Sequence, residues 1–301
     1  MKNVKPDLEI QVCGKWILAG EHAVLRGGDA LVFPLSSRFL KLNFHQSDDE
    51  FEINFDRRGH PELELILWSV LEKAFNKLHL KRRDLKGRLE FESKIIFGAG
   101  MGASATLCVS LTRLFCELGF LKSDEQYDFA RDLENLFHGE SSGVDVAVTL
   151  YNKPLLFSRN HGYQTLENYQ KPLLFLSHTG ARGVTKDCVD QVKKLFVTDR
   201  EKAESIDEKM KKAVKEFKFL LAEKTIDHSA WVRTLTHAHS CFYDWGLVNE
   251  AVRIHETQLL KAGAAAVKLT GSGGGGFMLS YWETPPPADV TFELIPCFNE
   301  A

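Results

Sequence analysis

A glycine-rich loop between an expected strand and an expected helix constrains this chain more than any other feature. The loop places Gly98, Gly100 and Gly102 within five positions. Residues 88–95 before it alternate as in a strand, and residues 104–118 after it repeat leucine and phenylalanine at helical spacing. Glycines let the backbone approach a ligand closely, and the N–H groups at a helix start attract anions. The pattern predicts a phosphate-binding loop, although a tight turn between packed elements is an equal alternative on these residues alone.

The loop differs from two common nucleotide-binding patterns. No Lys-Ser or Lys-Thr pair follows it, as a Walker A loop would require. Its spacing is Gly-x-Gly-x-Gly, whereas the dinucleotide fingerprint is Gly-x-Gly-x-x-Gly. Any assignment of the bound phosphate therefore depends on the rest of the chain.

Length and charge describe a globular chain that is long enough for two domains. The chain has 301 residues and a net charge of −3. The charges are well mixed, which argues against nucleic acid or a membrane surface as a partner. No apolar run approaches the roughly 18 residues of a spanning helix, and the start has no apolar signal segment, so we expect a cytoplasmic protein. The six cysteines form no Cys-x-x-Cys pair and are expected to be buried free thiols.

The hydrophobic pattern predicts an alternation of strands and helices. A helix is expected from Pro61, and four amphipathic helices packed on a sheet are expected over residues 186–260. The polar segment 160–171 suggests a boundary between an N-terminal domain, 1–160, and a C-terminal domain, 161–301. The tail after the prolines at 285–287 is expected to be peripheral. The expected strands span residues 8–18, 31–44, 50–55, 172–177, 265–270 and 277–281.

Several charged residues lie in apolar sequence, where unpaired burial would be costly. Lys15, Glu21 and His22 fall within eight residues of glycine-punctuated sequence near the start. Glu134 and Asp145 stand eleven apart across a glycine-containing loop. These residues could converge on a ligand. The alternatives are a solvated lysine, a hydrogen-bonded structural histidine, an exposed helix-end glutamate and a helix-capping aspartate.

A second glycine run lies between two expected strands near the end of the chain, at residues 271–276. A hairpin does not need five glycines, and so permissive a run is entropically expensive. Close approach to a ligand, or a moving loop, explains it better. Arg182, in a polar loop after another expected strand, could bind an anionic substrate group in bidentate fashion or could be a solvated arginine.

The ordered set of motifs resembles the GHMP kinase superfamily. Corresponding motifs occur in family order at residues 14–15, 20–24, 98–106, 138–145 and 268–276. The tetrapeptide Glu-His-Ala-Val is similar to that of members that phosphorylate mevalonate; galactokinases typically carry Glu-His-Thr-Asp, and phosphomevalonate kinases often Glu-Tyr-Ala-Val. The resemblance implies an α+β, two-domain GHMP kinase fold, with an N-terminal ribosomal-protein-S5-like α/β domain and a C-terminal ferredoxin-like α+β domain.

The same resemblance implies roles for individual residues. Ser104 and Glu134 would hold Mg²⁺, while Asp145 would accept the proton of the substrate hydroxyl or orient that hydroxyl beside Lys15. The residues expected to bind ATP are Gly98, Gly100, Gly102, Ala103, Ser104 and Ala105. The residues expected to bind the substrate are Glu21, His22, Arg182, Thr270 and Gly271.

The expected reaction is transfer of a phosphoryl group from ATP to the C5 hydroxyl of mevalonate, which depends mainly on positioning and charge neutralisation. A kinase for another small alcohol, such as phosphomevalonate or a sugar, and a non-catalytic binding protein are the alternatives. Ala103 replaces a serine of the family loop and removes one phosphate hydrogen bond, worth about 0.5–1.5 kcal/mol. Ile96 and Phe97 replace the usual prolines, and Glu140 also departs from the motif. The sequence leaves open whether the chain forms a homodimer.

Overall fold

The computed structural model describes residues 5–55, 61–96, 98–138 and 141–298. Phe97 and Glu140, two of the positions that depart from the family motifs, lie outside the described residues. The chain divides into two compact units, each built from segments distant in sequence. Unit 1 comprises Met1–Gly14, Arg38–Ile95 and Gly102–Asn152, and unit 2 comprises Lys15–Ser37, Ile96–Met101 and Lys153–Ala301. The boundary suggested at residues 160–161 stays a prediction.

Two long strands, β1 (Leu8–Ala19) and β2 (Asp29–Glu50), contribute residues to both units. The sequence predicts a strand over 31–44 and a separate one over 50–55. The separate strand is present as β3 (Glu52–Phe55), but β2 is longer than predicted. It continues to Glu50, and its register with β4 shifts between His45 and Glu50. Gly87 allows this irregularity, because a Cβ there would lie 2.2 Å from the carbonyl oxygen of His45.

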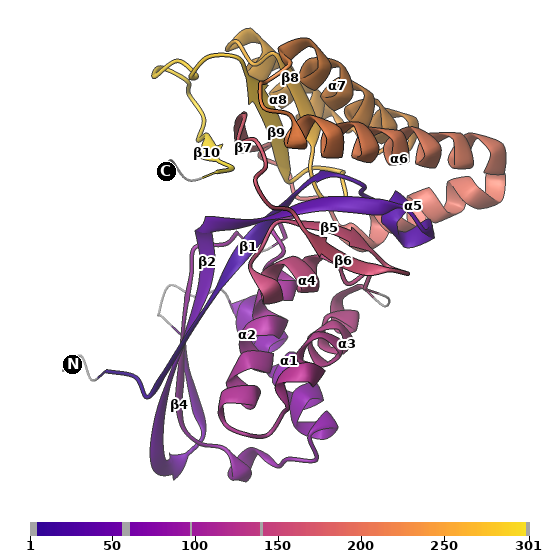
Figure 1. The fold of residues 1–301 in the computed structure, drawn as a ribbon. Coiled ribbons are helices and arrows are strands. Elements are labelled where there is room, and N and C mark those ends of the chain that lie inside the picture. Colours follow the sequence, from indigo (N-terminus) through magenta and orange to yellow (C-terminus); the bar gives the residue numbers. More distant parts are fainter. Residues whose placement is uncertain (1–4, 56–60, 97, 139–140, 299–301) are drawn as a thin grey trace. The chain divides into compact units, whose positions relative to one another are not determined.

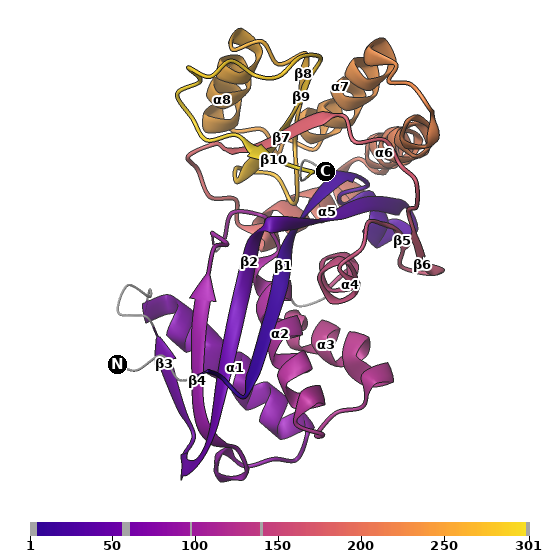
Figure 2. The same cartoon turned by 60° about the vertical axis from the view of Figure 1, so that its left-hand side comes forward.

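Unit 1 combines a sheet with helices that cover one of its faces (Figure 2). The second half of β2 pairs antiparallel with β4, and β3 pairs parallel with β4. Leu107, Leu111, Leu114 and Phe115 are buried on α2, as the helical spacing predicts. Leu118, the last residue of that pattern, follows the end of α2 and is only partly buried. The elements of unit 1 are β3 (Glu52–Phe55), α1 (Pro61–Lys77), η2 (Arg82–Asp84), β4 (Lys86–Ser93), α2 (Ala103–Glu117), η3 (Ser123–Glu125), α3 (Gln126–His138) and α4 (Val144–Tyr151).

Unit 2 contains a four-stranded sheet in the order β10-β7-β9-β8, all of whose pairs are antiparallel (Figure 1). The four helices predicted over 186–260 are confirmed: α5, α6 and α7 pack in sequence order, and α7 and α8 contact β8. The first residues of β2 pair with β5, which pairs with β6. The elements are η1 (Ala23–Arg26), β5 (Leu155–Ser158), β6 (Gly162–Thr165), β7 (Leu173–His178), α5 (Thr185–Thr198), α6 (Arg200–Ala222), α7 (His228–Asp244), α8 (Glu250–Lys261), β8 (Ala266–Leu269), β9 (Phe277–Trp282) and β10 (Ile295–Pro296).

The tail does not behave as the sequence predicts. Ile295 is buried and pairs with Leu176 across β10 and β7. The ring of Phe298 lies 5.5 Å from that of Trp16, edge to face. The apolar residues that follow the prolines therefore join the core of unit 2, because their burial outweighs the cost of ordering the segment.

All six cysteines are free thiols, as predicted, and five of them are buried. Within the part of the chain that the structure describes, no helix has the length and apolar character needed to cross a membrane.

Candidate active site

The turn after β1 holds two of the predicted substrate-binding residues in a constrained backbone. Gly20 has a φ of 107°, and a Cβ there would lie 2.3 Å from the carbonyl oxygen of Asp29, so only glycine fits. His22 also adopts a left-handed φ, of 58°, which is uncommon for a side chain of this size. Its Nε2 lies 2.8 Å from the carbonyl oxygen of Ser272 and donates to it. Strain of this kind gathers at functional sites.

Burial governs the charge of His22. Removal from water lowers its pKa from 6.5 to about 4, although the hydrogen bond to Ser272 opposes this effect. At neutral pH the ring is therefore uncharged, and the bond to a carbonyl oxygen places its proton on Nε2. His22 can hold a substrate group as a neutral polar residue but does not add positive charge to the site.

Three charged side chains are buried near this turn. Lys15, Glu21 and Lys268 are 3%, 3% and 0% exposed. Lys268 Nζ donates to Glu21 Oε1 and, at 2.5 Å, to the carbonyl oxygen of Leu269. Burial raises the pKa of Glu21 and lowers the pKa of Lys268, and each residue opposes the effect of burial on the other. The charges of both Lys268 and Lys15 act on Glu21, which makes the three residues one electrostatic group.

The two glycine segments meet in unit 2. A Cβ on Gly276 would lie 2.6 Å from the carbonyl oxygen of Ala99, and one on Gly100 would lie 3.6 Å from that of Thr270. The backbone N–H of Lys15 donates to the carbonyl oxygen of Met101 at 3.0 Å, which ties β1 to the same place. Gly276 is thus needed for close approach of backbone to backbone, whereas the distance at Gly100 is an ordinary contact.

Thr270 and Arg182 differ in how free their side chains are. Thr270 Oγ1 accepts from the N–H of Ile17 at 3.0 Å and donates to the carbonyl oxygen of Ile17 at 2.9 Å, so its hydroxyl joins β8 to β1. Arg182 is exposed, and its Cδ lies 3.8 Å from the position a Cβ would take on Gly98. Substrate contact by either residue stays a prediction; the geometry favours a structural role for Thr270 and a ligand beside Gly98 for Arg182.

Unit 1 carries the second half of the glycine loop at a helix start. Gly102, with a φ of 76°, precedes α2, and Ala103, Ser104 and Ala105 form its first turn. The first N–H groups of a helix have no partner within it and bear partial positive charge, which suits a phosphate. Phosphate binding by these residues stays a prediction, with which this helix start is compatible.

Glu134 and Asp145 lie on α3 and α4, both of which pack against α2. Glu134 is buried on α3 and accepts a hydrogen bond from Ser141 Oγ. Asp145 lies in the first turn of α4, which begins after Gly143 at a left-handed φ of 84°. The helices α2, α3 and α4 contact one another pairwise, so Ser104, Glu134 and Asp145 are carried by one packed group.

The donor set of unit 1 fits Mg²⁺ better than a softer metal. A serine hydroxyl and a buried carboxylate supply hard oxygen atoms, and Mg²⁺ typically takes one or two protein carboxylates together with substrate phosphates. Among the described residues there is no group of three or more His, Cys, Asp and Glu that could hold a metal ion.

The predicted site residues thus divide between the two units, and their convergence on one ligand stays a prediction. The set in unit 1 is Gly102, Ala103, Ser104, Ala105, Glu134 and Asp145. The set in unit 2 is Lys15, Glu21, His22, Gly98, Gly100, Arg182, Thr270 and Gly271. Lys268 was missed as a site residue, although a lysine inside a short apolar strand directly before a glycine run is a visible signal.

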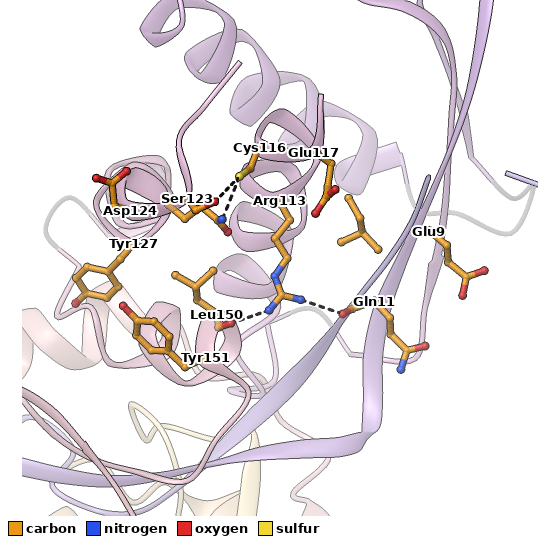
Figure 3. Close-up of a pocket in the computed structure, with 12 residues that line it drawn as sticks. Glu9, Gln11, Arg113, Cys116, Glu117, Ser123, Asp124, Tyr127, Leu150 and Tyr151 are labelled. Atoms are coloured by element: carbon orange, nitrogen blue, oxygen red, sulfur yellow. Dashed lines mark hydrogen bonds between the residues drawn. The ribbon is translucent and has the colours of Figure 1, made fainter. Parts of the chain in front are cut away.

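A hollow of about 730 Å³ in unit 1 contains none of the predicted site residues (Figure 3). Arg113 reaches into it, but its guanidinium donates to the carbonyl oxygens of Gln11 and Leu150. The other charged residues that line it are the carboxylates Glu9, Glu117 and Asp124, which would repel phosphate. The hollow is a poor candidate for the nucleotide site.

Comparison with known proteins identifies the class of protein that this fold and these motifs define, an ATP-dependent phosphotransferase. A family model described as GHMP kinases N terminal domain matches residues 66–153. Over these residues the chain is similar to the GHMP kinase family. A mevalonate kinase of Thermococcus sibiricus is 27% identical, and the match covers 88% of this chain and 86% of that protein.

Solved structures share the fold at lower identity. Mevalonate kinase of L. major, in complex with R-mevalonate, has a TM-score of 0.77 at 21% identity and covers 94% of this chain and 90% of its own. A phosphomevalonate kinase of Streptococcus pneumoniae, in complex with phosphomevalonate and AMPPNP, has a TM-score of 0.70 at 17% identity and covers 92% of this chain and 93% of its own. The α+β GHMP kinase fold expected from the motifs is confirmed.

Proposed function

We propose that this enzyme transfers the γ-phosphoryl group of ATP to the C5 hydroxyl of mevalonate, giving 5-phosphomevalonate and ADP. The observation that supports the proposal is the buried Gly20–His22 turn, which His22 joins to the glycine segment 271–276 through Ser272. This turn is set in a chain that is similar over most of its length to mevalonate kinases. The Glu-His-Ala-Val tetrapeptide at residues 21–24 supports the same substrate.

Several of the predicted residues would have a task in the transfer step. The N–H groups at the start of α2 would bind the phosphates, and Arg182 would add positive charge next to Gly98. Ser104 and Glu134 would hold Mg²⁺, which supplies charge neutralisation at the phosphates. Asp145 would accept the C5 hydroxyl proton, and Lys15 would stabilise the alkoxide that forms.

A panel of substrates tests the proposal by measuring ADP release. We expect release with mevalonate and little with phosphomevalonate or galactose at the same concentration. Turnover of another alcohol with none of mevalonate would refute the proposed substrate. Phosphomevalonate is the alternative to test first, because a phosphomevalonate kinase shares the fold.

Variants test the assigned chemistry. Asp145→Asn should lower kcat by about 10²–10⁴-fold while ATP binding is kept. Asp128→Asn is the matched control and should keep the activity, since Asp128 is an exposed carboxylate near the start of α3 in the same unit. Equal activity of Asp145→Asn and the wild type would remove Asp145 from the mechanism.

A further inference from the structure

Lys268 is a buried cation on a short strand for which the predicted roles leave no task. It lies on β8 between Val267 and Leu269 and is 0% exposed. Its Nζ donates to Glu21 Oε1 and to Leu269 O, and lies 5.0 Å from the centre of the Phe242 ring. Burying a lysine costs free energy even when the lysine is paired. These three contacts hold the ammonium group in place, and the ammonium group in turn holds the carboxylate of Glu21.

Only one of the two carboxylate oxygens of Glu21 has a hydrogen-bond partner among the described residues. Lys268 takes Oε1, while Oε2 is buried and has no hydrogen-bond partner among the described residues. A carboxylate oxygen is a strong acceptor, and a buried acceptor without a donor is costly. The unused oxygen lies on the residue that follows Gly20 and precedes His22, in the strained turn described above. A donor from outside the chain would satisfy it.

A purely structural ion pair explains this arrangement less well. Replacing a buried pair by apolar side chains of similar size is often neutral or stabilising, so the pair is weak evidence of a contribution to stability. A structural pair also has no reason to leave one carboxylate oxygen empty. The empty acceptor points to a ligand that carries a hydroxyl group.

We propose that Lys268 is a positioning residue that holds Glu21 so that Oε2 accepts a hydrogen bond from the C3 hydroxyl of mevalonate. This assignment rests on the proposed function. Mevalonate offers two hydroxyl donors, and the C5 hydroxyl is assigned to Asp145. The carboxylate of mevalonate would be repelled by the carboxylate of Glu21. The C3 hydroxyl is the donor that remains.

The test combines a substrate analogue with a paired substitution. The analogue is 5-hydroxy-3-methylpentanoate, which lacks the C3 hydroxyl and keeps the reacting C5 hydroxyl. The variant is the double substitution Glu21→Leu with Lys268→Met, which removes both charges together and avoids leaving one of them buried alone. Lys209→Met is the matched control, because Lys209 is a half-exposed lysine of the same unit whose partner is Asp244.

Wild-type enzyme should prefer mevalonate over the analogue by at least about 10-fold in kcat/KM, the value of a hydrogen bond to a charged acceptor. The double variant should lose this preference, with a KM for ATP and a urea midpoint close to those of the wild type. The Lys209→Met control should keep the preference. Loss of stability alone would not abolish discrimination between two substrates, so the readout separates positioning from folding.

Two results would overturn the assignment while leaving the proposed function intact. One is wild-type enzyme that uses mevalonate and the analogue equally well, which needs no variant at all. The other is a double variant that still prefers mevalonate by the wild-type factor. Absence of any turnover of mevalonate by the wild type would instead refute the proposed function and this assignment with it.

Discussion

Gly276 offers a direct measurement of how closely the two glycine segments must approach each other. A Cβ added there would lie 2.6 Å from the carbonyl oxygen of Ala99, about 0.9 Å inside the roughly 3.5 Å of a relaxed contact. Its φ of 80° is also left-handed, which costs an alanine roughly 1–2 kcal/mol. Overpacking against fixed backbone adds roughly 1–3 kcal/mol. Gly276→Ala should therefore lower the free energy of unfolding by about 2–5 kcal/mol.

Gly180 supplies the matched control. It has nearly the same φ, 79°, and belongs to the same unit, but a Cβ there would meet nothing within 4 Å. Gly180→Ala carries only the backbone cost, about 1–2 kcal/mol, and the effect of the extra methyl on the unfolded chain is the same in both variants. The difference between the two variants, about 1–3 kcal/mol, isolates the contact with Ala99.

Urea unfolding and ADP-release kinetics measure the two consequences of this contact. Gly276→Ala should be the less stable variant, and it should also show the larger rise in KM for ATP, because Ala99 lies between the loop glycines 98 and 100. Free energies of unfolding that agree within about 0.5 kcal/mol would refute the argument. Such agreement would mean that the backbone of residues 98–101 moves easily to make room for a methyl group at position 276. The close approach of the two segments would then not constrain the residue at that position.

Three further predictions concern single properties of the site and the core. The pKa of His22, about 4, lies below its unfolded value of 6.5, so the unfolded chain binds the proton first as pH falls. The neutral ring therefore makes its full contribution to the free energy of unfolding above pH 6.5. Up to about 3 kcal/mol of that free energy is lost as the pH falls towards 4. The difference in unfolding free energy between wild type and His22→Asn should shrink from pH 7 to pH 4.5, and a constant difference would contradict this. Arg182→Gln should raise the KM for ATP about 10-fold without changing the urea midpoint, whereas unchanged kinetics would remove Arg182 from the site. The melting temperature should be the same with and without a reducing agent, because all six thiols are free, and a drop under reduction would reveal a disulfide.

Local patterns were sufficient to predict most of the elements. The helical spacing after the glycine loop predicts α2, and the amphipathic stretch over 186–260 predicts four helices that the structure contains. Each of these segments buries one face, so its period is visible in the sequence. The family motifs then predicted the GHMP kinase fold from residues that are few but ordered.

The features that the sequence did not reveal depend on contacts between distant segments. The continuation of β2 to Glu50 depends on Gly87, which lies on the paired strand. The packing of Phe298 depends on Trp16, almost the whole length of the chain away. The partner of Lys268 is 247 positions earlier in the sequence. No window of neighbouring residues contains both members of these pairs.

The costly features of unit 2 are not scattered but occupy two short stretches, residues 15–22 and 268–276. The first contains a buried lysine, a buried carboxylate and a histidine with a positive φ. The second contains a buried lysine and a run of glycines with positive φ, one of them in contact range of Ala99. Selection for stability alone would replace such residues, because apolar side chains and ordinary turns would fold at lower cost. Their concentration in the two stretches that meet through Lys268 and Glu21 is therefore best explained by binding and catalysis, which makes this pair, more than the glycine loop, the place where substrate choice should be tested.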